Sequence, residues 1–201
     1  MFPRILFIKI DWLDRYQGED PPPTIFGPGA LCGERFNFKP FDGGVFGAVP
    51  KGQRFGLAMA DRHPWLVIWI AKPPAANPGN HQSAYRPAGW YEQATLLEGN
   101  RDRPEYAHDP AFPNFGQGRF QYTIHAAAKD AYLIPAERRQ SFPEIPTKPV
   151  ETEPTRFGNT MILYARCPGR FGTWRERYAS IAEEIASRRN SADRCDQSRK
   201  S

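Results

Sequence analysis

The sequence predicts a β-rich α+β fold: a curved sheet or small barrel with long loops and one helix packed on it near the C-terminal end. Short segments with strand-like patterns recur along the 201 residues, and one long segment has helical spacing. Hydrophobic residues make up 40% of the chain and charged residues 24%, as expected for a folded chain with its own core. We therefore expect one domain over residues 1–189 and a polar, disordered tail over residues 190–201.

The clearest predicted strand runs from Trp65 to Ala71, where every residue is apolar. Such a run is typical of a central strand buried on both faces. Residues 4–10 form the first predicted strand, with Leu6, Ile8 and Ile10 on one side. Further strands are expected at residues 44–49, 88–97, 120–125, 131–135 and 160–166.

The predicted helix spans residues 172–189. Thr173 is the expected N-cap, and Glu176 is its capping-box partner three residues later. The apolar stripe that should face the core consists of Trp174, Tyr178, Ile181 and Ile185. Segments rich in Pro, Gly and polar residues are expected to be loops, at residues 19–34, 72–87, 98–118 and 136–159.

Composition narrows the possible partners and the compartment. The formal net charge is +5, which permits an anionic partner, and arginine outnumbers lysine, which suits phosphate recognition and stacking. Three widely spaced cysteines without a CxxC pair support neither a zinc ribbon nor a disulfide framework. No signal peptide or membrane span is apparent. We expect a cytoplasmic protein that needs no membrane, metal or cofactor.

Short aromatic motifs at strand edges are the main functional signal. Aromatic side chains beside Gly, Asn and Arg can form a flat pocket that stacks a nucleobase. The candidate base-binding residues are Trp12, Tyr16, Asn37, Phe38, Trp90 and Tyr164. Core packing is the alternative for each aromatic residue, and turn capping is the alternative for Asn37. Trp90 and Tyr91 should face opposite sides of a strand, and Gly89 favours Trp90 as the pocket residue.

Arginines in or beside the long predicted loops are candidate phosphate contacts. They are Arg86, Arg101, Arg103 and Arg119. Solvated loop charges are the alternative for each of them. No residue is predicted to be catalytic, because the histidines are scattered and the chain contains neither a nucleophile elbow nor a phosphate-binding loop.

The order of these motifs resembles the modified-base reader domain at the N-terminus of some bacterial HNH restriction endonucleases, a member of the EVE/PUA-like group. The matching pieces are Ile5-Leu6-Phe7-Ile8, Asp11-Trp12, Tyr16-Gln17-Gly18, Phe36-Asn37-Phe38, residues 66–71, Gly89-Trp90-Tyr91 with Ala94-Thr95, residues 128–135 with Glu137-Arg138, and Gly158-Asn159 before Tyr164-Ala165. The series is collinear over roughly residues 4–166. Leu163 departs from the pattern, because the family has an aromatic residue before its last Tyr-Ala, and the change should reshape the pocket.

The resemblance implies a PUA-like fold and a function in bacterial restriction or defence. The expected ligand is double-stranded DNA with a modified base, such as 5-methylcytosine, and a nuclease would act in trans. Binding without cleavage is expected, because no histidine follows residue 166 to form an HNH site.

Three alternatives to this reading remain open. The first is an RNA-binding protein of the same PUA-like fold. The second is a small enzyme that uses His108 with Asp109, or His125 with Asp130. The third is a protein-interaction module that uses the proline-rich loops.

Overall fold

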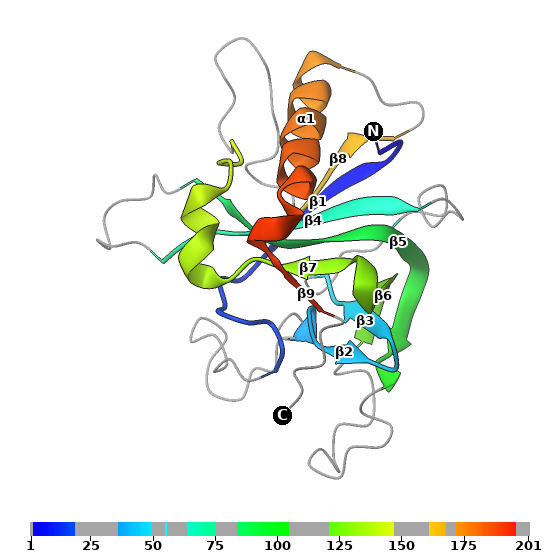
Figure 1. The fold of residues 1–201 in the computed structure, drawn as a ribbon. Coiled ribbons are helices and arrows are strands. Elements are labelled where there is room, and N and C mark those ends of the chain that lie inside the picture. The colour runs from blue at the N-terminus through cyan, green and yellow to red at the C-terminus, as the bar shows by residue number, and fades with distance from the viewer. Residues whose placement is uncertain are drawn as a thin grey trace.

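The computed structural model describes residues 2–18, 36–49, 55, 64–74, 84–104, 121–146, 161–167 and 172–195. Its strands are β1 (Ile5–Ile10), β2 (Pro40–Phe41), β3 (Gly44–Gly47), β4 (Trp65–Ala71), β5 (Arg86–Asp102), β6 (Gln121–Ala127), β7 (Ala131–Leu133), β8 (Ile162–Arg166) and β9 (Asp193–Arg194). Its helices are η4 (Ala128–Asp130), η5 (Ala136–Ser141), α1 (Thr173–Ser187) and η7 (Arg189–Ser191). Figure 1 shows their arrangement around one sheet.

The strands form one mixed sheet in the order β2-β3-β6-β5-β4-β1-β8. β7 pairs with β5 and carries β9 on its other side. β1 and β4 run parallel, whereas the other pairs are antiparallel. Within the described residues, the two end strands of this order, β2 and β8, do not pair with each other, so the sheet is open. The expected β-rich α+β fold is confirmed in its curved-sheet form, not as a small barrel.

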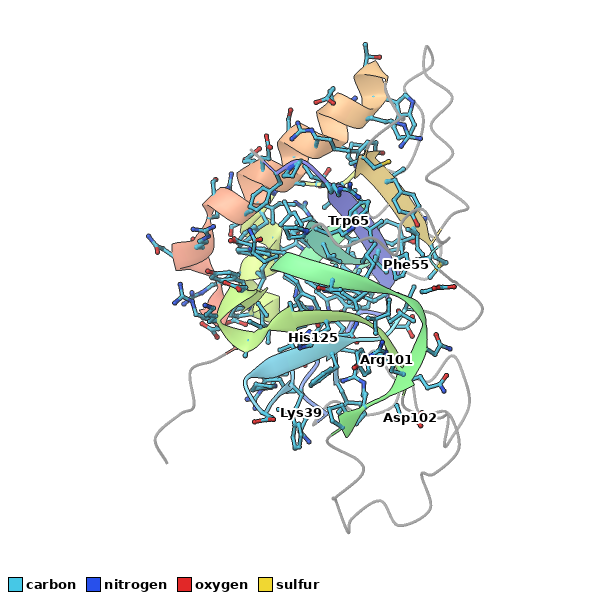
Figure 2. The ribbon with its side chains drawn as sticks, turned by 90° about the vertical axis from the view of Figure 1, so that its right-hand side faces the viewer. Lys39, Phe55, Trp65, Arg101, Asp102 and His125 are labelled. Carbon is cyan, nitrogen blue, oxygen red and sulfur yellow. The ribbon has the colours of Figure 1, made fainter. Side chains whose placement is uncertain are left out.

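β4 is the central strand that its apolar run predicts, with every residue buried between β1 and β5. Alternate residues of β4 point to opposite faces of the sheet, where they pack into two separate core clusters. The first core cluster includes Trp65, Val67, Trp69, Tyr91, Leu6, Ile8 and Ile10, together with Phe38 and Phe55. The second core cluster includes Leu66, Ile68, Ile70, Ile5, Phe7 and Trp90, together with Tyr178 and Ile185 of α1. Figure 2 labels Trp65 and Phe55 of the first cluster.

β5 extends beyond the predicted strand at residues 88–97. Its first half pairs with β4 and β7, and its second half pairs with β6. Gln93 adopts a positive φ of 53°, and the register with β6 shifts between Leu96 and Arg101. Gln93 lies where the strand changes partner from β4 to β6, and the register shift lies within the part that pairs with β6. The sequence predicts a loop at the polar end of β5, but Arg101 and Asp102 pair there with Tyr122 and Gln121 of β6.

α1 covers the second core cluster with its apolar stripe. Tyr178 and Ile185 are buried, and Trp174 and Ile181 pack against the cluster from its edge, so the predicted stripe is confirmed. The predicted cap is wrong, because Gly172 is the N-cap and no side chain caps the helix. No helix among the described residues combines the length and apolar character that crossing a membrane requires.

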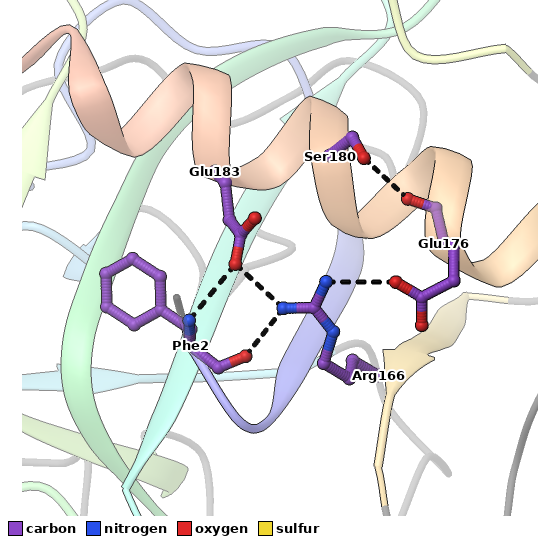
Figure 3. A network of polar contacts seen from close by, with 5 residues as sticks. All are labelled: Phe2, Arg166, Glu176, Ser180 and Glu183. Atoms are coloured by element: carbon purple, nitrogen blue, oxygen red, sulfur yellow. Dashed lines mark hydrogen bonds and ion pairs between the residues drawn. The ribbon is translucent and has the colours of Figure 1, made fainter.

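Arg166 of β8 connects the start of the chain to α1 (Figure 3). Its Nη1 donates to Glu183 Oε1 at 2.7 Å and to the carbonyl oxygen of Phe2 at 2.9 Å. Its Nη2 lies 3.0 Å from Glu176 Oε2. The backbone N–H of Phe2 also donates to Glu183 Oε1, at 3.1 Å. The expected capping-box residue Glu176 therefore pairs with a strand instead of capping the helix.

The C-terminal segment is ordered further than its polar sequence predicts. β9 pairs Arg194 with Tyr132 and Asp193 with Leu133, and Cys195 is buried. The expected boundary at residue 189 is therefore wrong for residues 190–195, because the free edge of β7 supplies backbone partners. Residues 196–201 lie outside the described residues.

Candidate functional site

The segment after β1 forms a compact turn around the ring of Tyr16. Tyr16 is fully buried and has a positive φ of 53°. Its hydroxyl donates to the carbonyl oxygen of Asp11 at 2.5 Å and accepts the N–H of Leu13 at 3.2 Å. Burial raises the pKa of the Asp11 carboxyl above its ordinary value. The Tyr16 hydroxyl is thus engaged in forming the turn.

A row of edge-to-face aromatic contacts runs inward from Tyr16. Its ring lies 5.9 Å from Phe38, which lies 5.3 Å from Tyr91, which in turn lies 5.3 Å from Trp69. All four side chains are fully buried. Tyr16 and Phe38 therefore fill the first core cluster and do not line an open base pocket.

Asn37 and Arg103 form a buried polar pair beside this row. Asn37 exchanges two hydrogen bonds with the backbone of Ala48, at 2.8 and 3.2 Å. Arg103 donates to Asn37 Oδ1 and to the carbonyl oxygen of Phe36, both at 3.1 Å. Asn37 is fully buried and Arg103 is only 2% exposed. Neither the amide nor the guanidinium is available to a base or a phosphate, because both are buried and bind buried polar groups.

Trp90 lies on the opposite face of the sheet from Tyr16, Phe38 and Tyr91. Its ring stacks on Tyr132 at 4.9 Å, and its Nε1–H donates to Glu92 at 3.2 Å. The predicted opposition of Trp90 and Tyr91 is confirmed. The choice of Trp90 as a partner of the other pocket candidates is not supported, because the sheet separates it from them.

Trp12 and Tyr164 are the two partly buried aromatic candidates, and both pack on the first core cluster. Tyr164 meets Trp65 edge to face at 6.0 Å, and the neighbouring Leu163 faces the second core cluster. The guanidinium of Arg139 lies 4.7 Å above the ring of Trp12. Trp12, Tyr16, Phe38 and Tyr164 therefore belong to or pack on one core cluster, with Asn37 bonded beside it, and within the described residues they form no open aromatic pocket.

The remaining candidate arginines are dispersed. Arg86 donates to the carbonyl oxygen of Phe142 at 2.8 Å and pairs with Glu144. Arg101 is exposed near the end of β5, where Figure 2 labels it. Arg119 lies outside the described residues. Among the four predicted phosphate contacts, Arg101 alone is both described and exposed.

A cleft of about 770 Å³ opens next to the turn that Tyr16 holds. Four segments distant in sequence form it. Its lining consists of Asp14, Arg15, Gln17, Pro40, Leu133, Pro135, Ala136, Glu137, Arg138, Asp193, Arg194 and Cys195. Two of these segments, around Gln17 and around Glu137-Arg138, are pieces of the motif series recognised in the sequence.

The lining combines opposite charges with apolar residues. Carboxylates come from Asp14, Glu137 and Asp193, and guanidinium groups come from Arg15, Arg138 and Arg194. Arg194 lies 5.4 Å from the ring of Tyr132 and donates to its hydroxyl at 3.3 Å. Leu133, Pro135 and Ala136 supply apolar surface. Such a site can accept hydrogen bonds from a ligand's amino groups and donate to its oxygens.

The sequence did not identify this site because no residue in it stands out alone. Asp14, Arg15 and the residues of β9 look like ordinary surface charges. The available signal was the pair of motifs at residues 16–18 and 137–138, which the structure brings to one cleft. Among the described residues, no three His, Cys, Asp or Glu side chains gather in a group able to hold a metal ion.

Among the described residues, the structure shows no histidine and aspartate arranged as the enzymatic alternative requires. His125 stacks on Phe46 with ring centroids 5.1 Å apart, and burial lowers its pKa. His108 and Asp109 lie outside the described residues. In the described part of the chain, no hydrogen bond or ion pair joins His125 to Asp130.

No family model, no curated protein and no solved structure matches this chain. The resemblance to an EVE/PUA-like reader therefore stays a prediction.

Proposed function

We propose that the protein binds nucleic acid and holds one base, taken out of its stack, in the cleft. The expected ligand is a modified cytosine in DNA, and the protein binds it without cleaving the strand. The single observation that carries this proposal is the cleft itself, whose lining combines three carboxylates and three arginines with apolar residues. This composition, rather than the aromatic pocket expected from the sequence, is the basis for the function.

The size of the cleft supports a ligand of this class. Its volume is about 770 Å³, and small-molecule sites usually measure about 300–1,000 Å³. A single base with its sugar is small enough to fit a cleft of this size. A double helix does not enter such a space, so a base must leave the stack to reach it, at a cost of a few kcal/mol.

The polar groups supply the recognition that aromatic stacking does not. A carboxylate such as Glu137 or Asp14 can accept hydrogen bonds from the exocyclic amine of cytosine. Gln17 has both a donor and an acceptor for the base edge. Arg15 and Arg138 are exposed, so they can reach phosphates that flank the base. Guanidinium planes can also stack on an extruded base.

A methyl group gains little from the apolar residues of the cleft alone. Its burial against Leu133, Pro135 or Ala136 contributes about 0.8 kcal/mol, or about a fourfold preference. Larger selectivity must therefore come from the shape of the cleft. Overall affinity must come from phosphate contacts and should fall as salt is added.

The test is a titration of the protein against matched duplexes with cytosine, 5-methylcytosine or 5-hydroxymethylcytosine, at two salt concentrations. We expect tighter binding to one modified duplex and a preference that survives added salt. Equal, weak binding that disappears with salt would overturn the proposal. Matched single-stranded DNA and RNA titrated in parallel identify the RNA alternative if RNA binds more tightly.

Two substitutions locate the binding to the cleft. Glu137→Gln should reduce the preference between bases, because it removes an acceptor, and Arg138→Ala should weaken binding to every duplex. Arg177→Ala is the control, because Arg177 is exposed on α1 and does not line the cleft. If Arg177→Ala weakens binding as much as Arg138→Ala, the interaction is with a general basic surface.

A further inference from the structure

Arg139 is a fully buried cation between two walls of the cleft. Its Nη1 donates to the carbonyl oxygen of Leu13 at 2.6 Å, and its Nη2 donates to the carbonyl oxygen of Asp14 at 2.8 Å. Its Nε donates to the carbonyl oxygen of Ile134 at 3.1 Å. One guanidinium thus joins residues 13–14 to the segment around residues 134–139.

Two aromatic rings set the orientation of this guanidinium. It lies 4.7 Å from the ring of Trp12 and 5.4 Å from the ring of Tyr16. A planar fork held between rings can point donors in two directions at fixed angles, which a lysine ammonium cannot do. Both aromatic residues were predicted to grip a base, whereas in the structure they contact Arg139.

The residues that Arg139 holds lie directly beside the cleft lining. Asp14, whose carbonyl oxygen it binds, lines one wall, and Arg15 follows it in the chain. On the other wall, Pro135 follows the bound Ile134, and Arg138 precedes Arg139. A small movement of the guanidinium would change the separation of these groups.

We propose that Arg139 is a positioning residue, which sets the distance between the walls of the cleft and thereby its selectivity. The predicted effect of Arg139 on binding rests on the function proposed above. Its predicted effect on the distance between the cleft walls does not. A purely structural role predicts only a less stable protein whose folded molecules bind as before. A positioning role predicts folded molecules that bind with altered preference.

Arg139→Lys separates these roles, because lysine keeps the charge and loses the fork. Well below its melting temperature, the variant should bind the preferred duplex about tenfold more weakly, as expected for a lost charged hydrogen bond. Its preference for that duplex over the unmodified one should also shrink. Arg177→Lys is the matched control, because Arg177 is exposed on α1 and does not line the cleft. It should leave the preference unchanged.

The accessibility of the Cys195 thiol measures how firmly the cleft walls are held, and the measurement needs no ligand. Cys195 lines the cleft and is only 5% exposed. Its rate of labelling by an aromatic disulfide reagent can be followed by peptide mass spectrometry, which distinguishes Cys195 from Cys32 and Cys167. Arg139→Lys should raise this rate about tenfold, because local opening becomes easier, and Arg177→Lys should not.

The outcomes are distinct. Faster labelling of Cys195 together with a reduced preference supports the positioning role, and unchanged labelling with unchanged preference overturns it. If the native protein binds no duplex selectively, the function proposal fails, while the labelling still tests the role of Arg139. If Arg139→Lys does not fold, Trp12→Leu removes one ring from the guanidinium and leaves its three carbonyl acceptors. Labelling at the native rate in that variant would overturn the proposal.

Discussion

The side-chain amide of Asn37 binds the backbone of Ala48 as a neighbouring strand would. The N–H of Ala48 donates to Oδ1 at 2.8 Å, and Nδ2 donates to the Ala48 carbonyl oxygen at 3.2 Å. Arg103 Nη2 donates to the same Oδ1. The Asn within the Phe-Asn-Phe motif thus completes the backbone pairing just after β3. Its position between two buried rings follows from this structural role.

Asn37→Ala should therefore destabilise the fold. The change leaves the backbone groups of Ala48 and one donor of Arg103 unpaired inside the protein, at about 1–3 kcal/mol for each unsatisfied group. We expect a loss of about 3 kcal/mol in the free energy of unfolding, measured by urea denaturation. Asn100→Ala is the control, because Asn100 is exposed and bonds Gln121 at 2.9 Å. If Asn37→Ala kept native stability but lost nucleic-acid binding, Asn37 would instead contact a base, as the sequence predicts.

Gly89 and Gly99 provide a matched pair on β5. A Cβ added at Gly89 would overlap the carbonyl oxygen of Tyr132 and the ring of Phe38, whereas a Cβ at Gly99 meets nothing within 4 Å. Gly89→Ala should cost about 3 kcal/mol, the upper part of the range for overpacking. Gly99→Ala should change stability by less than about 0.5 kcal/mol. Thermal melts of both variants check this, and equal melting temperatures would contradict the close strand packing at Gly89.

Trp90→Phe tests whether Trp90 belongs to the core. The change keeps a ring for stacking on Tyr132, but it removes the N–H that donates to the buried carboxylate of Glu92. The smaller ring and the lost hydrogen bond should together cost about 2 kcal/mol. Nucleic-acid affinity of the folded protein should not change. Reduced affinity at native stability would mean that Trp90 contacts the ligand after all.

Glu183→Gln should change the dependence of stability on pH. Burial favours the neutral form of Glu183, but hydrogen bonds from Arg166 and from the Phe2 N–H outweigh it and hold the pKa below its ordinary value of 4.5. Because the folded pKa is lower than the unfolded one, the stabilisation is complete above the unfolded pKa. It is lost as pH falls through the folded pKa.

Chemical denaturation of the native protein and the variant between pH 7 and pH 3 measures this effect. Glu183→Gln should lower stability at pH 7 by about 1 kcal/mol, since the pair is partly exposed, and it should flatten the acid side of the profile. Glu184→Gln is the control on the next residue, where an exposed pair with Arg188 contributes a few tenths of a kcal/mol. Parallel acid profiles for the native protein and Glu183→Gln would contradict the assignment.

The sequence by itself determined the elements whose hydrophobic pattern is local. Seven apolar residues in a row predicted β4 as the buried central strand, and alternation placed Trp90 and Tyr91 on opposite faces. Helical spacing identified the buried stripe of α1. These predictions succeed because burial of alternate or periodic side chains depends mainly on the chain's own repeat.

The tertiary structure alone decided which polar and aromatic residues are accessible. A buried Tyr16 and an exposed one look alike in sequence, and the fork of Arg139 acquires its role only when Leu13 lies beside it. The cleft has the same origin, because its walls come from four distant segments, one of them joined through β9. Backbone carbonyls and free strand edges bind whatever donors the fold brings near, and the hydrophobic pattern does not encode that choice.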